Sequence, residues 1–174
     1  MSAAHVIFET PRLIGRRLEP RDLQDLLAVY GDVPAMRWVG DRQPLDEEQC
    51  QRWLEITAYN YCVRGYGMFA IVERASEEVI GFCGLVHPDG QPDAELKYAF
   101  KRQAWGQGYA TEAANALVDY GACVHGLKQI IATVAPEHLA SHKVLLKVGL
   151  QWTERRTNED GSHTDVYRWT AVEA

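Results

Sequence analysis

The sequence predicts a single α/β domain built on a mixed sheet, and three observations support this prediction. The chain has 174 residues, which suits one domain with a proper hydrophobic core. Hydrophobic residues make up 47% of it and charged residues 24%, the balance of an ordinary soluble globular protein. Strand-like and helix-like segments follow one another neither as a regular β–α alternation nor as an all-β pattern. Because the sequence shows no repeat or linker, we expect one domain over 1–174 with its core at about 10–171.

The first part of the chain predicts one strand and two long helices. Alternating apolar and polar residues predict a strand over 13–18. Helical spacing predicts helices over 20–31 and 46–64, the first opened by a proline and the second by an acidic first turn. Residues 33–45 are expected to form a loop, because prolines and a glycine interrupt them. The apolar residues of this loop, Trp38 among them, either fold over the core or form the wall of a substrate pocket.

The rest of the chain brings the expected totals to about seven strands and four helices. Apolar and β-branched runs predict strands over 68–73, 79–87, 94–100, 129–134, 150–155 and 164–170. Helices over 110–123 and 137–148 are expected to follow the fourth and fifth of the seven strands. Side chains alternate along a strand, so one face of the fourth strand should carry Glu95, Lys97 and Ala99, and the other Leu96, Tyr98 and Phe100.

Charge, cysteine spacing and hydropathy exclude several classes of protein. The net charge of −6 argues against a general nucleic-acid binder and is compatible with an amine substrate. The four cysteines are far apart and form no C-x-x-C pair, so we expect neither a metal site nor a disulfide framework. The N-terminus does not read as a signal peptide, and the longest apolar run, 79–86, is too short to span a bilayer. We therefore expect a cytoplasmic protein with no membrane or nucleic-acid partner.

Two glycines one residue apart, Gly106 and Gly108, lie between the strand expected over 94–100 and the helix that follows it. A strand, a glycine turn and a helix start together point backbone N–H groups at an anion, and the helix macrodipole adds partial positive charge there. The first interpretation is a phosphate-bearing cofactor bound at 103–110. The alternative is a tight turn that needs glycine for steric reasons only, since short glycine motifs occur by chance.

The residues around these glycines give the sequence a family resemblance. Residues 103–108 match the pattern Q/R-x-x-G-x-G/A, and 105–113 continue it as Trp-Gly-x-Gly-Tyr-Ala-Thr-Glu-Ala. Further matches are the Ala-Ser pair of 138–141, the Lys-x-Gly of 147–150, and the opening Thr-Pro-Arg-Leu at 10–13. In these features, from about 10 to 170, the sequence resembles the GNAT superfamily of N-acetyltransferases, and most closely its RimJ/RimL-like branch.

The resemblance implies both a fold and a reaction. The GNAT fold has a mixed sheet of about seven strands, which separate between strands four and five, here 94–100 and 129–134. The implied reaction moves an acetyl group from acetyl-CoA to a primary amine, either a protein N-terminus or a small amine, by direct attack on the thioester. Because dimers are frequent in such folds, a homodimer is one assembly that the resemblance allows.

The resemblance also implies which residues contact each substrate. Those expected to hold acetyl-CoA are Tyr98, Ala99, Phe100, Arg102, Gln103, Trp105, Gly106, Gln107, Gly108, Tyr109, Ala110, His138 and Ser141. In the first three of these the backbone is expected to pair with the pantetheine arm, and 103–108 with the following helix start is expected to cradle the pyrophosphate. The residues expected to contact the acceptor are Trp38, Glu95 and Lys97.

Two residues are candidates for the proton transfers of this reaction. Glu95 is either the general base that takes the proton of the amine or a solvent-facing strand carboxylate. Ser141 is either the general acid for the leaving thiolate or a hydroxyl on a helix surface. Two positions depart from the branch pattern, His138 in place of Asn and Lys97 in place of Gly. These departures favour the alternative function, a non-catalytic module of the same fold that binds or senses acyl-CoA.

Overall fold

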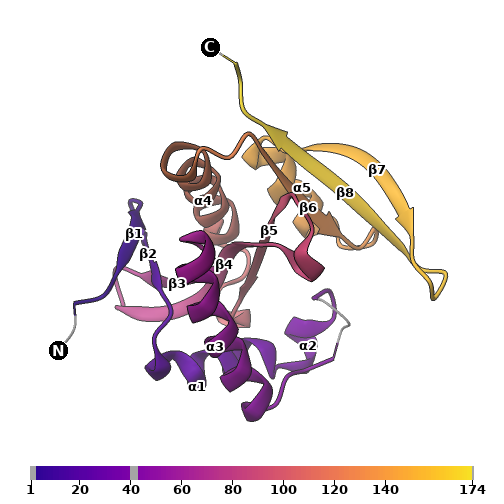
Figure 1. Cartoon of the computed structure of the whole chain (residues 1–174). Helices are drawn as coiled ribbons and strands as arrows, with labels where there is room; N and C mark the ends of the chain where they lie inside the picture. The colour runs from indigo at the N-terminus through magenta and orange to yellow at the C-terminus, as the bar shows by residue number, and fades with distance from the viewer. Residues whose placement is uncertain (1–2, 40–42, 174) are drawn as a thin grey trace.

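The structure of the protein is a computed structural model that describes residues 3–39 and 43–173. Within these residues, eight strands form one open sheet in the order β1-β2-β3-β4-β5-β6-β8-β7 (Figure 1). The strands are β1 (Val6–Glu9), β2 (Leu13–Arg17), β3 (Met68–Glu73), β4 (Glu78–Val86), β5 (Ala94–Phe100), β6 (Gln129–Val134), β7 (Gln151–Thr157) and β8 (His163–Thr170). The helices are α1 (Leu23–Tyr30), α2 (Val33–Met36), α3 (Glu47–Arg64), α4 (Tyr109–His125) and α5 (Leu139–Val148). The expected mixed α/β sheet is therefore confirmed.

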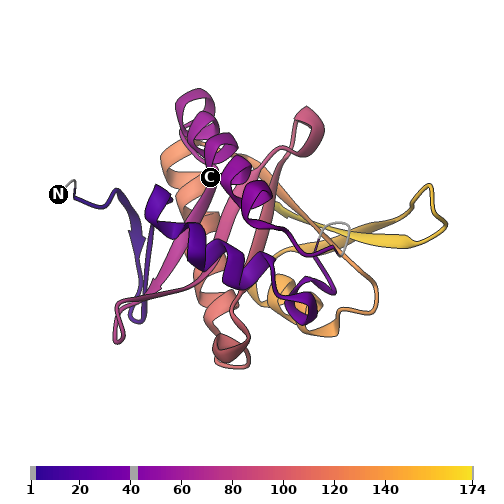
Figure 2. The same ribbon diagram turned by 90° about the horizontal axis from the view of Figure 1, so that it is seen from below.

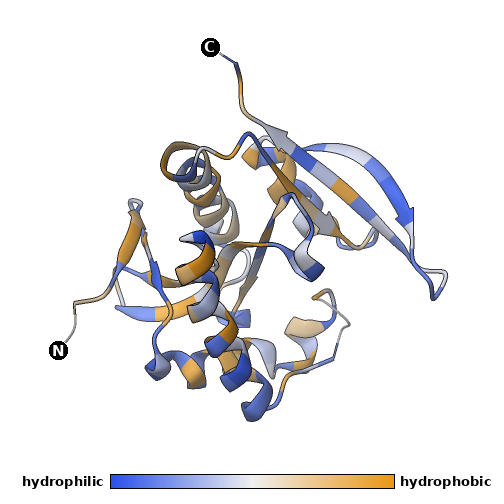
Figure 3. Cartoon of the chain, viewed as in Figure 1, coloured by the Kyte–Doolittle hydropathy of each residue, from blue (hydrophilic) through white to orange (hydrophobic). Residues whose placement is uncertain are grey.

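Helices cover both faces of the sheet, α1 to α3 on one face and α4 with α5 on the other (Figures 1 and 2). The alternation of side chains along β3 divides the core accordingly. Met68 and Ala70 pack in the cluster that contains residues of α1, α2 and α3, whereas Phe69 and Ile71 pack in the cluster that contains residues of α4 and α5. Hydrophobic residues gather on the central strands, while the β7–β8 hairpin is mostly hydrophilic (Figure 3).

Two elements were not expected from the sequence. The short strand β1 adds an eighth strand to the expected seven, and it pairs with β2 in an antiparallel register. The segment expected to be a loop, 33–45, begins with the single-turn helix α2. A loop was expected there partly because of Pro34. Proline interrupts the interior of a helix but is tolerated in the first turn, and Pro34 lies in the first turn of α2.

The sheet opens between β5 and β6, which are its parallel pair. They are in register only at Ala94↔Ile130 and Glu95↔Ile131 and then diverge (Figure 1). Each strand is paired along its length with its other neighbour, β5 with β4 and β6 with β8. The expected separation of the strands at 94–100 and 129–134 is thereby confirmed.

A buried ion pair joins the sheet to the turn that begins α1. Arg16 of β2 donates from both terminal nitrogens to the carboxylate of Asp22, at 2.8 and 2.7 Å. The same carboxylate accepts the backbone N–H of Glu19 at 2.8 Å. Arg16 is 6% exposed and Asp22 1%, and their hydrogen bond raises the pKa of Arg16.

Replacing Asp22 with alanine should lower the free energy of unfolding by about 3 kcal/mol, because it leaves a buried guanidinium without its partner. Urea unfolding at pH 7 measures this change. Glu48→Ala is the control, since Glu48 pairs with Arg52 across 3.5 Å on the surface of α3. We expect this control to change the free energy by less than about 0.5 kcal/mol. Equal effects of the two substitutions would contradict the role given to the buried pair.

Candidate active site

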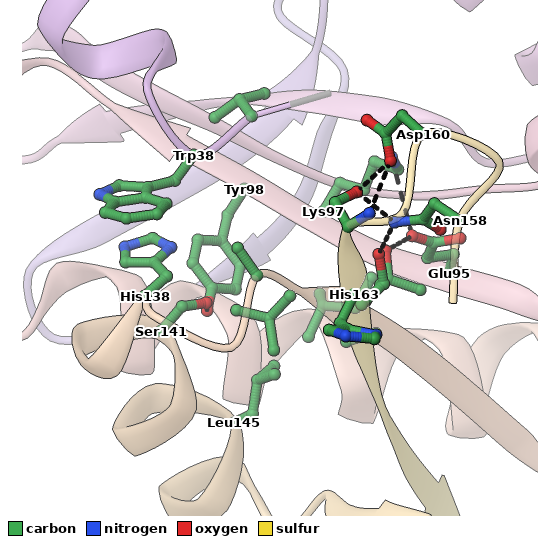
Figure 4. A pocket seen from close by; sticks show the side chains of 18 residues that line it. Trp38, Glu95, Lys97, Tyr98, His138, Ser141, Leu145, Asn158, Asp160 and His163 are labelled. Carbon is green, nitrogen blue, oxygen red and sulfur yellow. Dashed lines mark hydrogen bonds and ion pairs between the residues drawn. The ribbon is translucent and has the colours of Figure 1, made fainter. Parts of the chain in front are cut away.

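The opening between β5 and β6 leads into a cavity of about 460 Å³. Its wall is formed by residues of both strands, the segment before α5, α5 itself, the segment after α2, and the β7–β8 turn (Figure 4). Six residues that the sequence singled out line this one cavity: Trp38, Glu95, Lys97, Tyr98, His138 and Ser141. Both catalytic candidates and all three acceptor candidates are therefore brought together.

Glu95 lies where the two strands part, and it is not a solvent-facing carboxylate. It is 4% exposed. Its Oε1 accepts the hydroxyl of Thr133 on β6 at 2.6 Å, and its Oε2 accepts the side-chain amide of Gln91 at 3.1 Å. The ammonium of Lys97 lies 3.7 Å from Oε1. Two hydrogen bonds from separate segments thus fix the orientation of a buried negative charge at one side of the cavity.

Ser141 lies on the other side of the cavity, in the first turn of α5. Its Oγ is 2.6 Å from the phenolic oxygen of Tyr98, and the residue is 8% exposed. Burial raises the pKa of Tyr98, so its hydroxyl keeps its proton at neutral pH. Ser141 is therefore not a helix-surface hydroxyl; it forms a hydroxyl pair with the half-buried Tyr98 that faces the cavity (Figure 4).

His138 precedes α5 and forms a wall of the cavity together with Trp38. The imidazole and indole rings stack, with centroids 5.3 Å apart and planes 12° apart. Burial lowers the pKa of His138, and the nearby His142 lowers it further. The imidazole is therefore neutral at pH 7, which lets it stack on an apolar ring without desolvating a charge.

The turn between β7 and β8 supplies polar wall residues that sequence reasoning missed. The side-chain amide of Asn158 donates to the hydroxyls of Ser162 and Thr164, at 2.9 and 3.0 Å, and all three residues line the cavity with Asp160 and His163. The sequence indicated a hairpin from its Asp-Gly pair. It carried no signal that the turn reaches the opening between β5 and β6, because that placement depends on the register of β8 against β6.

The backbone of β5 offers fewer free positions than the resemblance implied. The N–H of Lys101 bonds to the carbonyl of Ile80 on β4 at 2.9 Å. Alternate residues of an antiparallel ladder bond to the same neighbour, so Ala99 also turns its backbone groups to β4. Tyr98 and Phe100 turn theirs toward the opening. By this register, Tyr98 and Phe100 are better placed than Ala99 to pair with a ligand through their backbone groups.

The glycine turn lies at the other end of β5, between that strand and α4. Gly106 and Gly108 have φ of 75° and 81°, in the region that disfavours any side chain. A Cβ built at Gly106 meets nothing within 4 Å, and at Gly108 the nearest atom is 3.5 Å away. Close packing therefore does not explain these glycines. They give the turn its shape, and the space beside it is open to a ligand at the start of α4, where N–H groups have no helical partner.

A set of contacts from the N-terminal strands braces this turn. Arg12 donates to the backbone carbonyl of Gln107 at 2.8 Å and to the carboxylate of Glu112 at 2.7 Å. Glu112 also accepts the hydroxyl of Thr10 at 2.6 Å. The guanidinium of Arg12 lies over the ring of Tyr109, 4.3 Å from its centroid. The opening segment of the chain thus holds the turn and the first turn of α4 in one geometry.

The remaining residues expected at the cofactor lie in and around this turn. The indole N–H of Trp105 donates to the carbonyl of Phe100 at 2.9 Å, and the side-chain amide of Gln107 donates to the carbonyl of Gln103 at 3.0 Å. Arg102 pairs with Asp32 at 2.7 Å. Tyr109 is buried, and its hydroxyl donates to Glu73 at 2.5 Å. Ala110 is half-buried in the first turn of α4.

None of these turn residues lines the cavity, so the structure divides the expected site into two parts that β5 connects.

Within residues 3–39 and 43–173, no cluster of three or more His, Cys, Asp or Glu side chains could hold a metal ion. The same residues contain no helix with the length and hydropathy needed to cross a membrane.

Comparison with known proteins identifies the family. The acetyltransferase (GNAT) domain family matches residues 12–151. The uncharacterized N-acetyltransferase YoaA of Bacillus subtilis is 31% identical over 147 residues, which cover 83% of this chain and 82% of YoaA. A GNAT-family acetyltransferase structure from Bacillus anthracis superimposes with a TM-score of 0.81 at 22% identity, covering 93% of this chain and 96% of that one.

The fold is also shared with RimL, a ribosomal L7/L12 alpha-N-protein acetyltransferase whose structure contains coenzyme A. This structure superimposes with a TM-score of 0.80 at 16% identity, covering 95% of this chain and 98% of RimL. The family match extends from Arg12, which braces the glycine turn, to the first residue of β7, and it includes the turn and the greater part of the cavity wall. The chain therefore belongs to the GNAT family of acetyltransferases.

Proposed function

We propose that the protein is an acetyl-CoA-dependent N-acetyltransferase that acetylates a primary amine, either a protein N-terminus or a small amine. The observation that carries the proposal is the cavity between the diverging strands, in which the buried carboxylate of Glu95, near the start of β5, and the hydroxyl pair of Tyr98 and Ser141 face the same space, while the glycine turn follows the end of the strand. Acetyl-CoA would supply an activated acetyl group as a thioester, which an amine attacks directly. The family membership of the chain supports this choice of donor.

The donor would be held mainly by backbone groups. The open side of the glycine turn and the N–H groups at the start of α4 suit a pyrophosphate, because they combine unpaired donors with the positive end of the helix dipole. From there the backbone of Tyr98 and Phe100 would pair with the pantetheine amides across the opening. The carbonyl of Phe100 already accepts the indole N–H of Trp105. The groups left to pair with the pantetheine are therefore the N–H of Phe100 and the N–H and carbonyl of Tyr98.

Glu95 is proposed as the general base. Attack requires a neutral amine, so a base must remove a proton from the ammonium, directly or through one water. The carboxylate is fixed by Thr133 and Gln91, and it faces the cavity from the point where β5 and β6 part. A base that is already oriented loses little entropy when the amine arrives.

The hydroxyl pair of Ser141 and Tyr98 is proposed as the general acid. A thiolate leaves when the carbon–sulfur bond breaks, and it takes a proton from a nearby donor. Ser141 can donate its proton to the sulfur and recover one from Tyr98 across 2.6 Å. The raised pKa of Tyr98 keeps its hydroxyl protonated at neutral pH, and a proton from solvent replaces the one that it passes to Ser141. A backbone N–H of β5 that points into the opening would stabilise the oxyanion formed during attack.

Two further parts of the proposal concern the setting of the reaction. Acetyl-CoA is a cytoplasmic metabolite, and we place the reaction in that compartment. A homodimer stays a prediction, which light scattering on the purified protein tests. The alternative function, a non-catalytic acyl-CoA sensor, shares the donor site and differs in turnover, so the measurements below separate the two.

A substitution in the glycine turn tests the donor site. Titration calorimetry should detect acetyl-CoA binding, and Gly108→Val should raise the Kd at least about tenfold, because the side chain blocks the approach of a phosphate to N–H donors. Gly126→Val is the matched control. Gly126 ends the same helix, has a positive φ of 65° and has open space around it, so the backbone strain is similar. Equal Kd values for the two variants would contradict the placement of the pyrophosphate.

A substitution of Glu95 tests the proposed general base. Glu95→Gln should lower kcat by about 10²- to 10⁴-fold, because an amide cannot accept the proton, while the Kd for acetyl-CoA stays within about twofold. A panel of amines with a free-thiol readout measures turnover. Glu78→Gln, at the exposed start of β4, should leave kcat unchanged. Acetyl-CoA binding by the wild type without turnover of any amine would favour the sensor instead.

A further inference from the structure

Lys97 places a positive charge in the part of the cavity where the acceptor is expected. It follows Glu95 by two residues on β5, so the two side chains leave the same face of the strand (Figure 4). The Lys97 side chain is 43% exposed, whereas that of Glu95 is 5% exposed. Among the described residues that line the cavity, Lys97 is the one lysine or arginine. The site therefore presents a buried anion beside an accessible cation.

Glu95 does not depend on Lys97 for its orientation. The distance of 3.7 Å between the ammonium and Oε1 is too long for a hydrogen bond, although it is short enough for charge attraction. Thr133 and Gln91 donate the hydrogen bonds that hold the carboxylate. Lys97 is on a long, flexible stem, so its ammonium can turn to a ligand without releasing Glu95.

This arrangement discriminates between kinds of amine. A simple alkylammonium would bring a second positive charge beside Lys97, and like charges at this range repel each other. An amine that also carries an anion can direct its nitrogen to Glu95 and its anion to Lys97, so each of these two residues gains an opposite charge. A lysine ammonium is a frequent ligand of carboxylates and phosphates.

Resting on the function proposed above, we propose that the acceptor is an amine with a carboxylate or phosphate a few bonds from its nitrogen, and that Lys97 binds this anion. The adjacent wall is polar, since Ser162 and Thr164 of the β7–β8 turn line the cavity together with Asp160, which accepts the hydroxyl of Ser162. Lys97 is thereby a residue that determines specificity. It stands where the branch typically has glycine, and this departure supplies the cation that binds the acceptor's anion.

The test compares matched acceptors, one of which in each pair carries an anionic group that its partner lacks. The pairs are β-alanine with β-alaninamide, O-phosphoethanolamine with ethanolamine, and the peptide Asp-Ala-Ala with Asn-Ala-Ala, and kcat/KM is measured at saturating acetyl-CoA. Lys97→Met should lower kcat/KM for the anionic member about 10- to 100-fold more than for its neutral partner, the range that a charge-assisted hydrogen bond supplies. The pair that responds most identifies the source of the anion.

Two further variants make the test specific to this position. Lys97→Gln should give the same selective loss, since its amide keeps a polar side chain without the charge. Lys147→Met removes a lysine from the exposed last turn of α5, outside the cavity, and should leave the ratio within each pair unchanged. Taking the ratio of variant to wild type for each acceptor cancels the differences in intrinsic amine reactivity.

The outcomes separate this proposal from the proposed function. Lys97→Met enzyme that keeps the preference for anionic acceptors, or wild-type enzyme that prefers the neutral member of every pair, overturns the role of Lys97 while leaving acetyl transfer intact. If no amine is acetylated, the proposed function fails by itself. Calorimetry with β-alanine and O-phosphoethanolamine on the protein–CoA complex then decides: binding that Lys97→Met weakens supports the anion site, and equal or absent binding overturns it.

Discussion

The short pairing between β5 and β6 is the constraint on which the rest of the site depends. These strands are in register at two positions and then separate, although polar backbone groups in the interior of a sheet need partners. Each strand is held from its outer side, β5 by β4 and β6 by β8, so the gap does not close. The gap leaves Tyr98 and Phe100 facing an opening, and a ligand with amide groups can complete the interrupted ladder. The same divergence makes room for α5 to bring Ser141 against Tyr98.

The glycine turn acquires its geometry from a distant part of the chain. Positive φ at Gly106 and Gly108 makes the turn possible, but glycine also makes a loop flexible. Arg12 compensates for this flexibility by binding the carbonyl of Gln107 and the carboxylate of Glu112, which ties the turn to the first turn of α4. This explains why the opening Thr-Pro-Arg-Leu and the later Thr-Glu-Ala belong to one pattern: their side chains contact each other.

The sequence pointed to the glycine turn, the proposed donor site, more directly than to the cavity proposed for the acceptor, and the reason is physical. The donor side is built from local backbone geometry, in which a strand, a glycine turn and a helix start are consecutive, so a short pattern is enough to reveal it. The acceptor side is assembled from segments far apart in the sequence. Glu95 is fixed by Thr133, and Asn158 reaches the cavity only because β8 pairs with β6. The burial of Glu95 could not be predicted either, since strand alternation assigns its side chain to one face without showing what covers that face.

His138 shows how a departure from a family pattern can change the role of a position rather than remove it. An asparagine there would offer hydrogen bonds to the cavity, whereas His138 stacks its ring on Trp38. Trp38 follows α2 on one face of the sheet and His138 precedes α5 on the other, so the stack spans the gap between the two layers (Figure 4). The lowered pKa of His138 keeps the ring neutral, and a neutral ring can be buried against indole without the cost of desolvating a charge. The departure therefore forms an aromatic wall for the cavity, whose polar lining comes from β5, α5 and the β7–β8 turn.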